Sequence, residues 1–353
     1  KNPFSNYYIC LVMKNQEIAQ LFFEEFLGEK ATAFLALPQS GSARMNFIGK
    51  SSNETYVITY NENLLENEAF FYFTEAFSDL KLNTPQIFKI NEERKLYIQE
   101  FLGEKTLSEI ITLEGESERV KSLVKQTLKH LFELQEKTQN KIDFSKTFEY
   151  EKYDELPITH DLYYFKNYLI DILELPYHKS TLLKEFKKIV QKIENLAPKS
   201  LMIRDFQARN ILVNDINEVF FIDYQAAMEG PALYDVVSFL FQAKANFSEN
   251  FKNEMLEYYF SFHPLEQRNE LEKSLKYCKM IRFIQVLGAY GFRGLIQRKP
   301  HFIASLEQGI QNLVEFTKTE LEMNEYPELK NLILQLNTTE TKNKIQKLID
   351  LNH

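Results

Sequence analysis

The sequence has no tryptophan, only two cysteines, and only ten glycines and ten prolines among its 353 residues. So little glycine and proline excludes collagen-like and low-complexity chains. Cys10 and Cys278 are too far apart in sequence to suggest a disulfide framework, and no cluster of cysteines offers a metal site. Both are therefore predicted to be inert, buried thiols. The 44% of hydrophobic and 26% of charged residues are typical of a globular protein with an ordinary core.

Long hydrophobic runs are also absent. The longest, such as residues 219–222 and 236–241, fall far short of the roughly 18 residues that a membrane-spanning helix needs. Residues 1–14 have neither the apolar stretch nor the small-residue cleavage site of a secretory signal. These features predict a cytoplasmic protein with no membrane partner.

The chain carries no excess of positive charge, since its formal net charge is −8. This balance argues against a nucleic-acid partner, whose binding depends on neutralising phosphates. One segment differs, because residues 273–306 contain no Asp or Glu but several Lys and Arg. Two interpretations stay open for it: a helix face paired with acids elsewhere, for example residues 114–118, or an anion-recognising part of a site.

The first third of the chain mixes helical and strand patterns. Helical spacing of apolar residues predicts helices over 16–28 and 65–77. Strand-like composition between turn residues predicts strands at 33–37, 44–48, 55–60, 86–90 and 95–100. This order predicts a small antiparallel sheet in an N-terminal lobe, residues 1–102.

The remainder, residues 103–353, is predicted to be a mostly helical lobe. Long helical patterns cover 118–138, 161–173, 182–196 and 271–296. Three short apolar segments at 201–203, 211–213 and 219–222 interrupt them and predict strands, including a central hairpin. The whole is therefore predicted to be an α+β protein with two lobes around a cleft. For residues 337–353, a terminal helix and a solvated tail both remain open.

Polar residues follow these interrupting strands. Asp205 and Asn210 lie at the two ends of a short loop between two strands, and Asp223 ends a wholly apolar strand. Asn210 and Asp223 offer the hard oxygen ligands that Mg²⁺ prefers, and Asp205 could accept the proton of an attacking hydroxyl. The pattern predicts phosphoryl transfer by positioning and charge neutralisation.

The segments 203–210, 221–225 and 230–235 together resemble the aminoglycoside phosphotransferase and choline kinase superfamily, which has a two-lobed protein-kinase-like fold. Within it they are most similar to anomeric kinases of N-acetylmuramate and N-acetylglucosamine in cell-wall recycling. The resemblance implies that Asp205 is the catalytic base and that Asn210 and Asp223 hold Mg²⁺. It implies that Asp235 braces the catalytic loop, although a helix-capping acid would look alike. Arg209 is a candidate for stabilising the transferred phosphoryl group, or else a surface residue.

The same resemblance implies an ATP site in the N-terminal lobe. The candidate loop over the phosphates contains Ser40, Gly41, Ser42 and Arg44. Glu100 and Leu102 would form the hinge at adenine, and Glu68 would be the helix glutamate that pairs with a lysine on the third strand. An ordinary hairpin turn would give the same signal at residues 40–42.

Two departures from the family pattern stand out. Thr59 occupies the place expected for the third-strand lysine, and Ile203 replaces the histidine that often precedes Arg-Asp. Arg44 or Lys50 could supply the missing cation, Mg²⁺ could carry the whole load, or ATP binding could be impaired. Because Asp205, Asn210 and Asp223 are all retained, a working kinase is favoured over a nucleotide-binding pseudokinase.

The acceptor is predicted to be a small-molecule sugar or amino alcohol. The basic segment favours an uncharged or anionic amino sugar, for which Arg293 and Asp161 are candidate ligands. The alternative is an aminoglycoside or choline-type kinase, since aromatic residues for a quaternary-ammonium site are plentiful. The sequence leaves open the acceptor's identity, ATP against GTP, and the oligomeric state.

Overall fold

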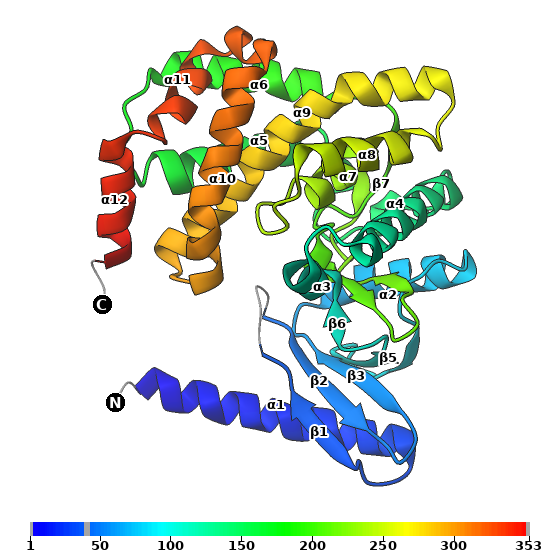
Figure 1. Ribbon diagram of the computed structural model, residues 1–353. Coiled ribbons are helices and arrows are strands. Elements are labelled where there is room, and N and C mark those ends of the chain that lie inside the picture. Colours follow the sequence, from blue (N-terminus) through cyan, green and yellow to red (C-terminus); the bar gives the residue numbers. More distant parts are fainter. Residues whose placement is uncertain (1–2, 39–42, 351–353) are drawn as a thin grey trace.

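The computed structural model describes residues 3–38 and 43–350, in which a small sheet lies beside a larger helical part (Figure 1). The sheet is antiparallel, has five strands and has the order β1-β2-β3-β5-β4. Its strands are β1 (Ala33–Ala36), β2 (Met45–Lys50), β3 (Thr55–Tyr60), β4 (Ile87–Ile90) and β5 (Leu96–Glu100). The predicted small antiparallel sheet is therefore confirmed, with strand ends shifted by one or two residues.

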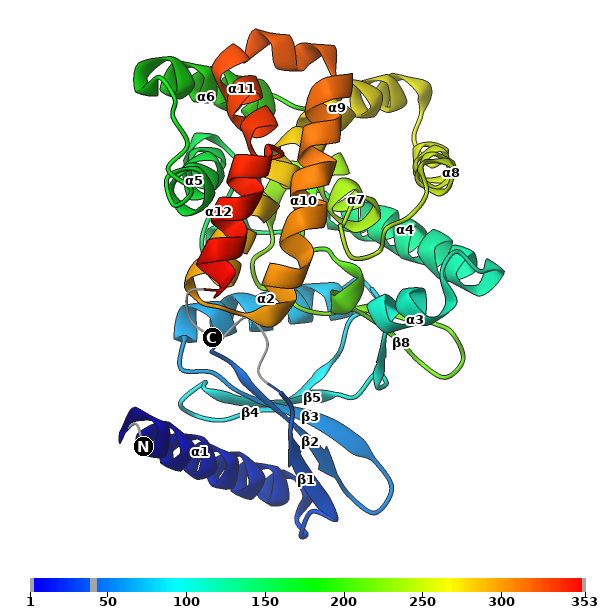
Figure 2. The same cartoon turned by 60° about the vertical axis from the view of Figure 1, so that its left-hand side comes forward.

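Helices cover both faces of this sheet. Helix α1 (Pro3–Leu27) lies on the face away from the helical part, and α2 (Leu64–Asp79) lies between the sheet and the helical part (Figure 2). Phe23 of α1 packs in one cluster with Phe47 and Ile58 of the sheet. At Gly49 a Cβ atom would lie 2.5 Å from the Phe23 ring, so glycine permits this close approach. The predicted helix over 16–28 is confirmed, but it begins earlier.

The helical part contains all of the long helices that the sequence predicted. Its helices are α3 (Leu107–Glu114), α4 (Glu118–Thr138), α5 (Glu155–Phe165), α6 (Lys179–Glu194), α7 (Leu233–Leu240), α8 (Glu249–Phe260), α9 (Leu265–Tyr290), α10 (Pro300–Thr319), α11 (Pro327–Gln335) and α12 (Thr339–Asp350). Two of the predicted helices end differently: π-helical turns, η2 (Lys166–Ile170) and η4 (Gly291–Ile296), follow α5 and α9. Helix α12 settles the open question at 337–353 in favour of a terminal helix.

Short strands within the helical part position the polar loops. They are β6 (Lys105–Thr106), β7 (Lys199–Met202), β8 (Ile211–Val213), β9 (Val219–Phe221) and β10 (Met228–Pro231). The predicted hairpin is β8–β9, and β6 joins its edge. Strand β7 pairs instead with β10, a strand that the sequence pattern did not reveal. The chain therefore leaves β7 and β9 at neighbouring points, and the polar loops begin there.

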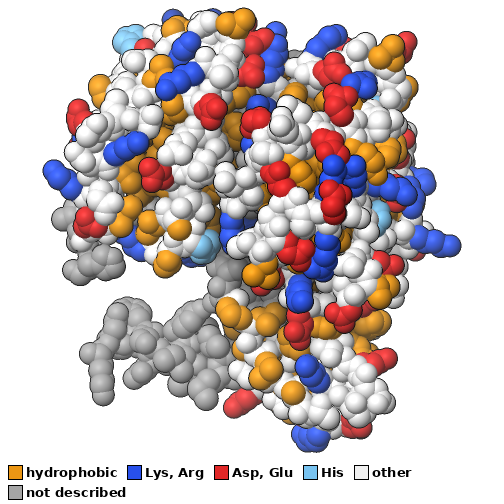
Figure 3. Space-filling model, in the orientation of Figure 1, with side chains coloured by type: hydrophobic (Ala, Val, Ile, Leu, Met, Phe, Trp, Pro, Cys, Tyr) orange, Lys and Arg blue, Asp and Glu red, His pale blue; other side chains and the backbone are white. Residues whose placement is uncertain are grey.

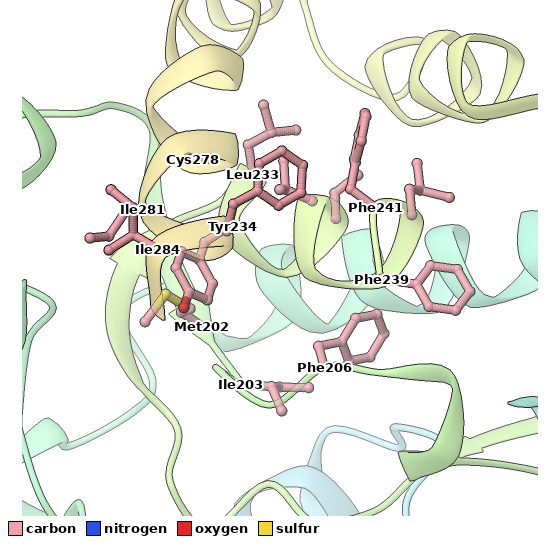
Figure 4. Close-up of a cluster of buried hydrophobic side chains, with 14 of the residues drawn as sticks. Met202, Ile203, Phe206, Leu233, Tyr234, Phe239, Phe241, Cys278, Ile281 and Ile284 are labelled. Atoms are coloured by element: carbon pink, nitrogen blue, oxygen red, sulfur yellow. The ribbon is translucent and has the colours of Figure 1, made fainter. Parts of the chain in front are cut away.

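A continuous hydrophobic core supports these loops. Figure 4 shows Ile203 and Phe206 of the first loop near Tyr234 and Phe239 of α7, with Ile284 of α9 in the same region. The same core extends to α2 and β5, so the two parts of the molecule share packing. The division at residue 102 stays a prediction.

Two sequence predictions concern the whole chain. Cys278 is buried, and burial raises the pKa of its thiol to about 12, which agrees with an inert role; the side chain of Cys10 lies outside the described residues. No helix in the described part of the chain is long and apolar enough to cross a membrane. Acidic and basic side chains are interspersed on the face shown in Figure 3.

Candidate active site

The loop after β7 is held by a carboxylate beneath it. Asp235 of α7 is fully buried and accepts hydrogen bonds from the backbone N–H groups of Ile203 (2.6 Å) and Arg204 (3.0 Å). Burial raises the pKa of Asp235 to about 7, although these two N–H groups act in the opposite direction. Arg204 has a φ of 71°, a conformation that such bracing can maintain in a non-glycine residue. This is the contact that the sequence analysis expected of Asp235.

Asp205 projects from the braced loop and meets three side chains of the same loop. Arg209 Nη2 donates to Asp205 Oδ2 at 3.0 Å, and Gln207 donates to Oδ1. The Asn210 amide donates to the backbone carbonyl of Asp205 at 2.9 Å. Burial raises the pKa of Asp205, but the charges of Arg209 and Arg282 and the hydrogen bonds outweigh it and hold this pKa below its usual value. The carboxylate is thus ionised at neutral pH, as a proton acceptor must be.

Asp223 follows β9 with a φ of 66° and lies next to the same loop. Asn210 Nδ2 lies 3.3 Å from Asp223 Oδ2 and 3.4 Å from Asp205 Oδ2, so the three predicted residues do meet. Gln225 Nε2 donates to Asp223 Oδ1 at 3.1 Å, and Arg44 donates to the same oxygen.

The Asn210–Asp223 pair fits a magnesium ion in its chemistry. Among residues 3–38 and 43–350, no three His, Cys, Asp or Glu side chains form a metal-binding group. Mg²⁺ does not need such a group, because it usually takes one or two protein oxygens and completes its shell with phosphate oxygens and water. One amide oxygen and one carboxylate provide that small set.

Arg282 of α9 is a site residue that the sequence analysis did not single out. Its side chain is buried, its Nη2 lies 3.9 Å from Asp205 Oδ1, and its Nη1 donates to Gln285 at 2.6 Å. The signal was present, because Arg282 belongs to the acid-free segment and lies one helical turn after buried Cys278. Of the two interpretations of that segment, pairing with acids elsewhere holds for Lys276, which pairs with Glu322 of the 3-10 helix at 321–325. Arg282 lies next to Asp205, and anion recognition by the segment stays a prediction.

A cavity opens beside this cluster, between the α7 end, α9 and α10. Its polar lining consists of Gln207, Ser238, Gln242, Arg282, Tyr290 and Asn312, and its apolar lining includes Phe241, Phe283 and Val286. Ser238 is 1% exposed, and its hydroxyl has no hydrogen-bond partner among the described residues. Gln207 and Arg282, which line the cavity, both lie next to Asp205, although Asp205 itself is not part of the lining.

The structure corrects the prediction for Asp161. This residue is 1% exposed and accepts hydrogen bonds from Arg204 Nη2 (2.9 Å) and the Tyr153 hydroxyl (2.8 Å). Its carboxylate therefore holds Arg204 of the loop after β7 and is not part of the cavity lining. In the sequence, an acid that binds the acceptor and an acid that supports Arg204 would both look like a polar residue on a helix with aromatic neighbours.

Arg293 is also displaced from the expected place. It lies in η4, and its guanidinium lies 5.4 Å from the centroid of the Phe302 ring. It is not among the residues that line the cavity, and no contact with Asp205 is found in the described part of the chain. Arg282, eleven residues earlier, is the arginine that α9 brings to the base.

In the N-terminal lobe, the glutamate near the site is not Glu68. Glu68 pairs with Arg94 at the exposed side of α2 and does not reach the cluster. Glu66 lies there instead, with its Oε1 3.5 Å from Arg44 Nε. The correction follows from helical geometry, since residues two apart lie on different sides of a helix.

The remaining predicted nucleotide residues lie where β5 leaves the sheet. Glu100 ends β5 and accepts a hydrogen bond from the Gln86 backbone at 3.2 Å, and Leu102 is buried. Gly103 follows with a φ of 119°, and a Cβ there would lie 3.1 Å from the Val213 carbonyl, so the chain passes close to β8. Ser40, Gly41 and Ser42 lie outside the described residues.

Comparison with known proteins agrees with this geometry. Residues 38–269 match the model of the phosphotransferase enzyme family. No curated protein matches the sequence. Among solved structures, choline kinase LicA from Streptococcus pneumoniae has a TM-score of 0.58 and 12% identity, with 86% of this chain and 99% of that chain covered.

Two aminoglycoside-related structures are similar to the same extent. APH(2")-IIa in its gentamicin complex has a TM-score of 0.57 and 19% identity, covering 86% of this chain and 97% of its own. A thermostable mutant of aminoglycoside phosphotransferase APH(4)-Ia, in complex with ADP and hygromycin B, has a TM-score of 0.56 and 16% identity, covering 83% and 97%. These similarities confirm the predicted two-lobed, protein-kinase-like α+β fold. Because the family model matches more than half of the sequence, this chain belongs to the phosphotransferase enzyme family.

Proposed function

We propose that this protein is an ATP- and Mg²⁺-dependent kinase that phosphorylates a hydroxyl group of an uncharged or anionic amino sugar. The acceptor we favour is the anomeric hydroxyl of N-acetylmuramate or N-acetylglucosamine. The observation that carries the proposal is the cavity beside the Asp205 cluster, whose described lining holds amides, hydroxyls and one buried arginine but no carboxylate.

The chemistry assigned to the chain's own residues is simple. Asp205 receives the acceptor hydroxyl and takes its proton, because its arginine neighbours keep it ionised. Asp235 holds the loop that carries Asp205, and Arg209, which donates to Asp205, is the residue we assign to stabilising charge on the transferred phosphoryl group. When bound, Mg²⁺-ATP supplies the phosphoryl group and part of the charge neutralisation, with Asn210 and Asp223 as the residues that would hold the metal.

The cavity lining favours a sugar over a cation. Amides and hydroxyls pair with sugar hydroxyl and acetamido groups, and the Arg282 guanidinium can bind a carboxylate. A polycationic aminoglycoside or a quaternary ammonium would meet this buried positive charge in a cavity whose described lining offers no carboxylate. The rings of Phe241, Phe283 and Tyr290 nevertheless resemble part of an aromatic cage, so a choline-type kinase is the second candidate.

Turnover against a panel of acceptors tests the proposal. Purified protein with Mg²⁺-ATP is mixed with N-acetylmuramic acid, N-acetylglucosamine, choline or kanamycin, and ADP release is compared with a blank without acceptor. We expect release with an amino sugar only, and ³¹P NMR should show a phosphate on its C1 oxygen. Release with choline or kanamycin instead would contradict the assigned acceptor class.

The Asp205→Asn variant separates an enzyme from a pseudokinase. Loss of the base should reduce turnover by about a hundredfold or more, while Mg²⁺-ATP binding stays close to that of the parent protein. The matched control is the Lys273→Met variant, which should keep full turnover because Lys273 is exposed and pairs with Glu270 at the surface. If the parent protein binds ATP but turns over none of the acceptors, the pseudokinase alternative takes first place.

A further inference from the structure

The N-terminal lobe lacks the lysine that kinases of this fold place on the third strand. Such a lysine pairs with a helix glutamate and with the nucleotide phosphates. In this protein the position is Thr59, which is 1% exposed. Its Oγ1 donates to Asn46 Oδ1 (2.8 Å) on β2 and accepts from Gln99 Nε2 (3.1 Å) on β5. Three neutral side chains on adjacent strands therefore occupy the place of the cation.

A different cation reaches the same partners from the neighbouring strand. Arg44 immediately precedes β2 and lies two residues before Asn46, so both side chains lie on the sheet face that carries Thr59. Arg44 Nη2 donates to Asp223, the candidate metal ligand, and Arg44 Nε lies 3.5 Å from Glu66 Oε1 of α2. Lys50, the other cation considered for this role, lies at the opposite end of β2.

The environment keeps Arg44 charged and in place. Its side chain and that of Glu66 are each 15% exposed. The carboxylates of Asp223 and Glu66 both lie next to the Arg44 guanidinium and balance its charge. Glu66 is itself held by Asn61 Nδ2 at 2.9 Å. The Arg44 guanidinium therefore has the helix-glutamate partner that the lysine has in other kinases, and it also reaches the candidate metal ligand after β9.

From this geometry we infer that the Arg44–Glu66 pair replaces the missing lysine–glutamate pair, with Arg44 as the cation that binds the nucleotide's outer phosphates and Glu66 as its positioning residue. The inference rests on the proposed nucleotide-dependent function. It gives Thr59 a purely structural role. The planar guanidinium suits this task, because it binds phosphate in bidentate fashion.

Nucleotide binding, measured by calorimetry on the full chain, tests this inference without any acceptor. In Arg44→Ala, affinity for Mg²⁺-ATP should fall about tenfold to a hundredfold, while affinity for adenosine, which has no phosphates, should change by less than about twofold. Arg44→Gln, which keeps a polar side chain but removes the charge, should lose as much as the alanine variant. The control Lys50→Ala, at the far end of β2, should bind both ligands like the parent.

Two further variants test the replacement itself. Glu66→Gln should weaken ATP binding only when Arg44 is present, so the double variant Arg44→Ala/Glu66→Gln should bind no worse than Arg44→Ala. Returning the cation to the third strand, in Arg44→Ala/Thr59→Lys, should recover part of the lost ATP affinity. A thermal melt of each variant shows that it is folded.

The outcomes distinguish this inference from the proposed function. If the parent protein binds neither ATP nor adenosine, the proposed function fails first. If the parent binds ATP and Arg44→Ala and Arg44→Gln bind it equally well, the inference alone is wrong. Equal losses for ATP and adenosine would also overturn it, because they would mean that Arg44 shapes the lobe and does not contact phosphate.

Discussion

At the scale of single residues, the site is built from charges that control one another. Asp205 is surrounded by two arginines, and each comes from a different element: Arg209 from its own loop and Arg282 from α9. Arg282 also lines the cavity, so it is placed to act on both the base and the acceptor. This double position makes it the most informative residue to change.

We predict that Arg282→Met reduces kcat/KM for the acceptor by about tenfold to a hundredfold, because a buried charged partner is lost. Mg²⁺-ATP affinity should stay within about twofold of the parent value, since the cavity is the proposed site of the acceptor and not of the nucleotide. Steady-state kinetics and calorimetry measure the two quantities. A gain of activity towards choline or kanamycin would show that Arg282 had been excluding cations, whereas unchanged kinetics would remove Arg282 from the acceptor site.

Asp235 gives a prediction about pH. Its folded-state pKa of about 7 lies above the ordinary value for Asp, so the folded protein binds this proton more tightly than the unfolded chain does. The contribution of Asp235 to the free energy of unfolding should therefore decrease as pH rises from about 4 to 7, by about 4 kcal/mol at most, and level off above 7.

Urea unfolding at several pH values checks this prediction. As pH rises through that range, the unfolding free energy of the parent should decrease relative to that of Asp235→Asn, because asparagine does not titrate. Exposed Glu340→Gln is the control and should keep the parent's pH dependence. A parent and Asp235→Asn with the same pH dependence would contradict the raised pKa.

At the scale of elements, the close contact between α1 and the five-stranded sheet fixes the position of β2. Phe23 lies where a side chain at position 49 would have to go, so the glycine sets the distance between the helix and β2. Arg44 precedes this same strand, and its position therefore depends on how β2 is held.

We predict that Gly49→Ala lowers the free energy of unfolding by about 1–3 kcal/mol, because the added Cβ overlaps the Phe23 ring and the Ile58 side chain. Chemical denaturation measures the loss. The double variant Gly49→Ala/Phe23→Leu should recover part of it by making room, and Lys50→Ala, on the other face of the strand, should cost little. A double variant that is less stable than the sum of its single changes would argue against this steric explanation.

At the scale of the whole molecule, the candidate site is assembled from both lobes. Asp223 receives a hydrogen bond from Asn210 of the helical part and an ion pair from Arg44 of the sheet part. A nucleotide with its metal ion would bind to both parts and not to the unfolded chain, so it should stabilise the folded state.

We predict that saturating Mg²⁺-ADP raises the Tm by about 5 °C. Because Asp223 is the candidate metal ligand, Asp223→Asn or removal of the metal with EDTA should abolish most of this increase. Differential scanning calorimetry gives the Tm values, and adenosine without metal provides the reference for base binding alone. An increase that survives in Asp223→Asn would place the metal on other residues.

The sequence alone determined the order of the elements and the two loops that carry the candidate site residues, one with Asp205 and Asn210 and one with Asp223. Hydrophobic periodicity, short apolar strands and turn residues act locally, so α4, the β8–β9 hairpin and the five strands of the sheet could be predicted. Asp205, Asn210 and Asp223 could be found for the same reason, because each adjoins a strand whose end sets its position.

Only the tertiary structure decided which distant side chains join them. It brings Arg282 next to Asp205, where Arg293 had been expected near the site. It brings Glu66, and not Glu68, next to Arg44, and it pairs Asp161 with Arg204. For Glu66 and Glu68 the choice depends on the rotation of α2, because a shift of two residues turns a side chain to another face. Arg293 instead lies about three turns farther along the chain than Arg282, in η4, so its distance from Asp205 depends on where that turn packs. The contact of Arg44 with Asp223 joins residues 179 positions apart, and only the packing of the two lobes against each other brings them together.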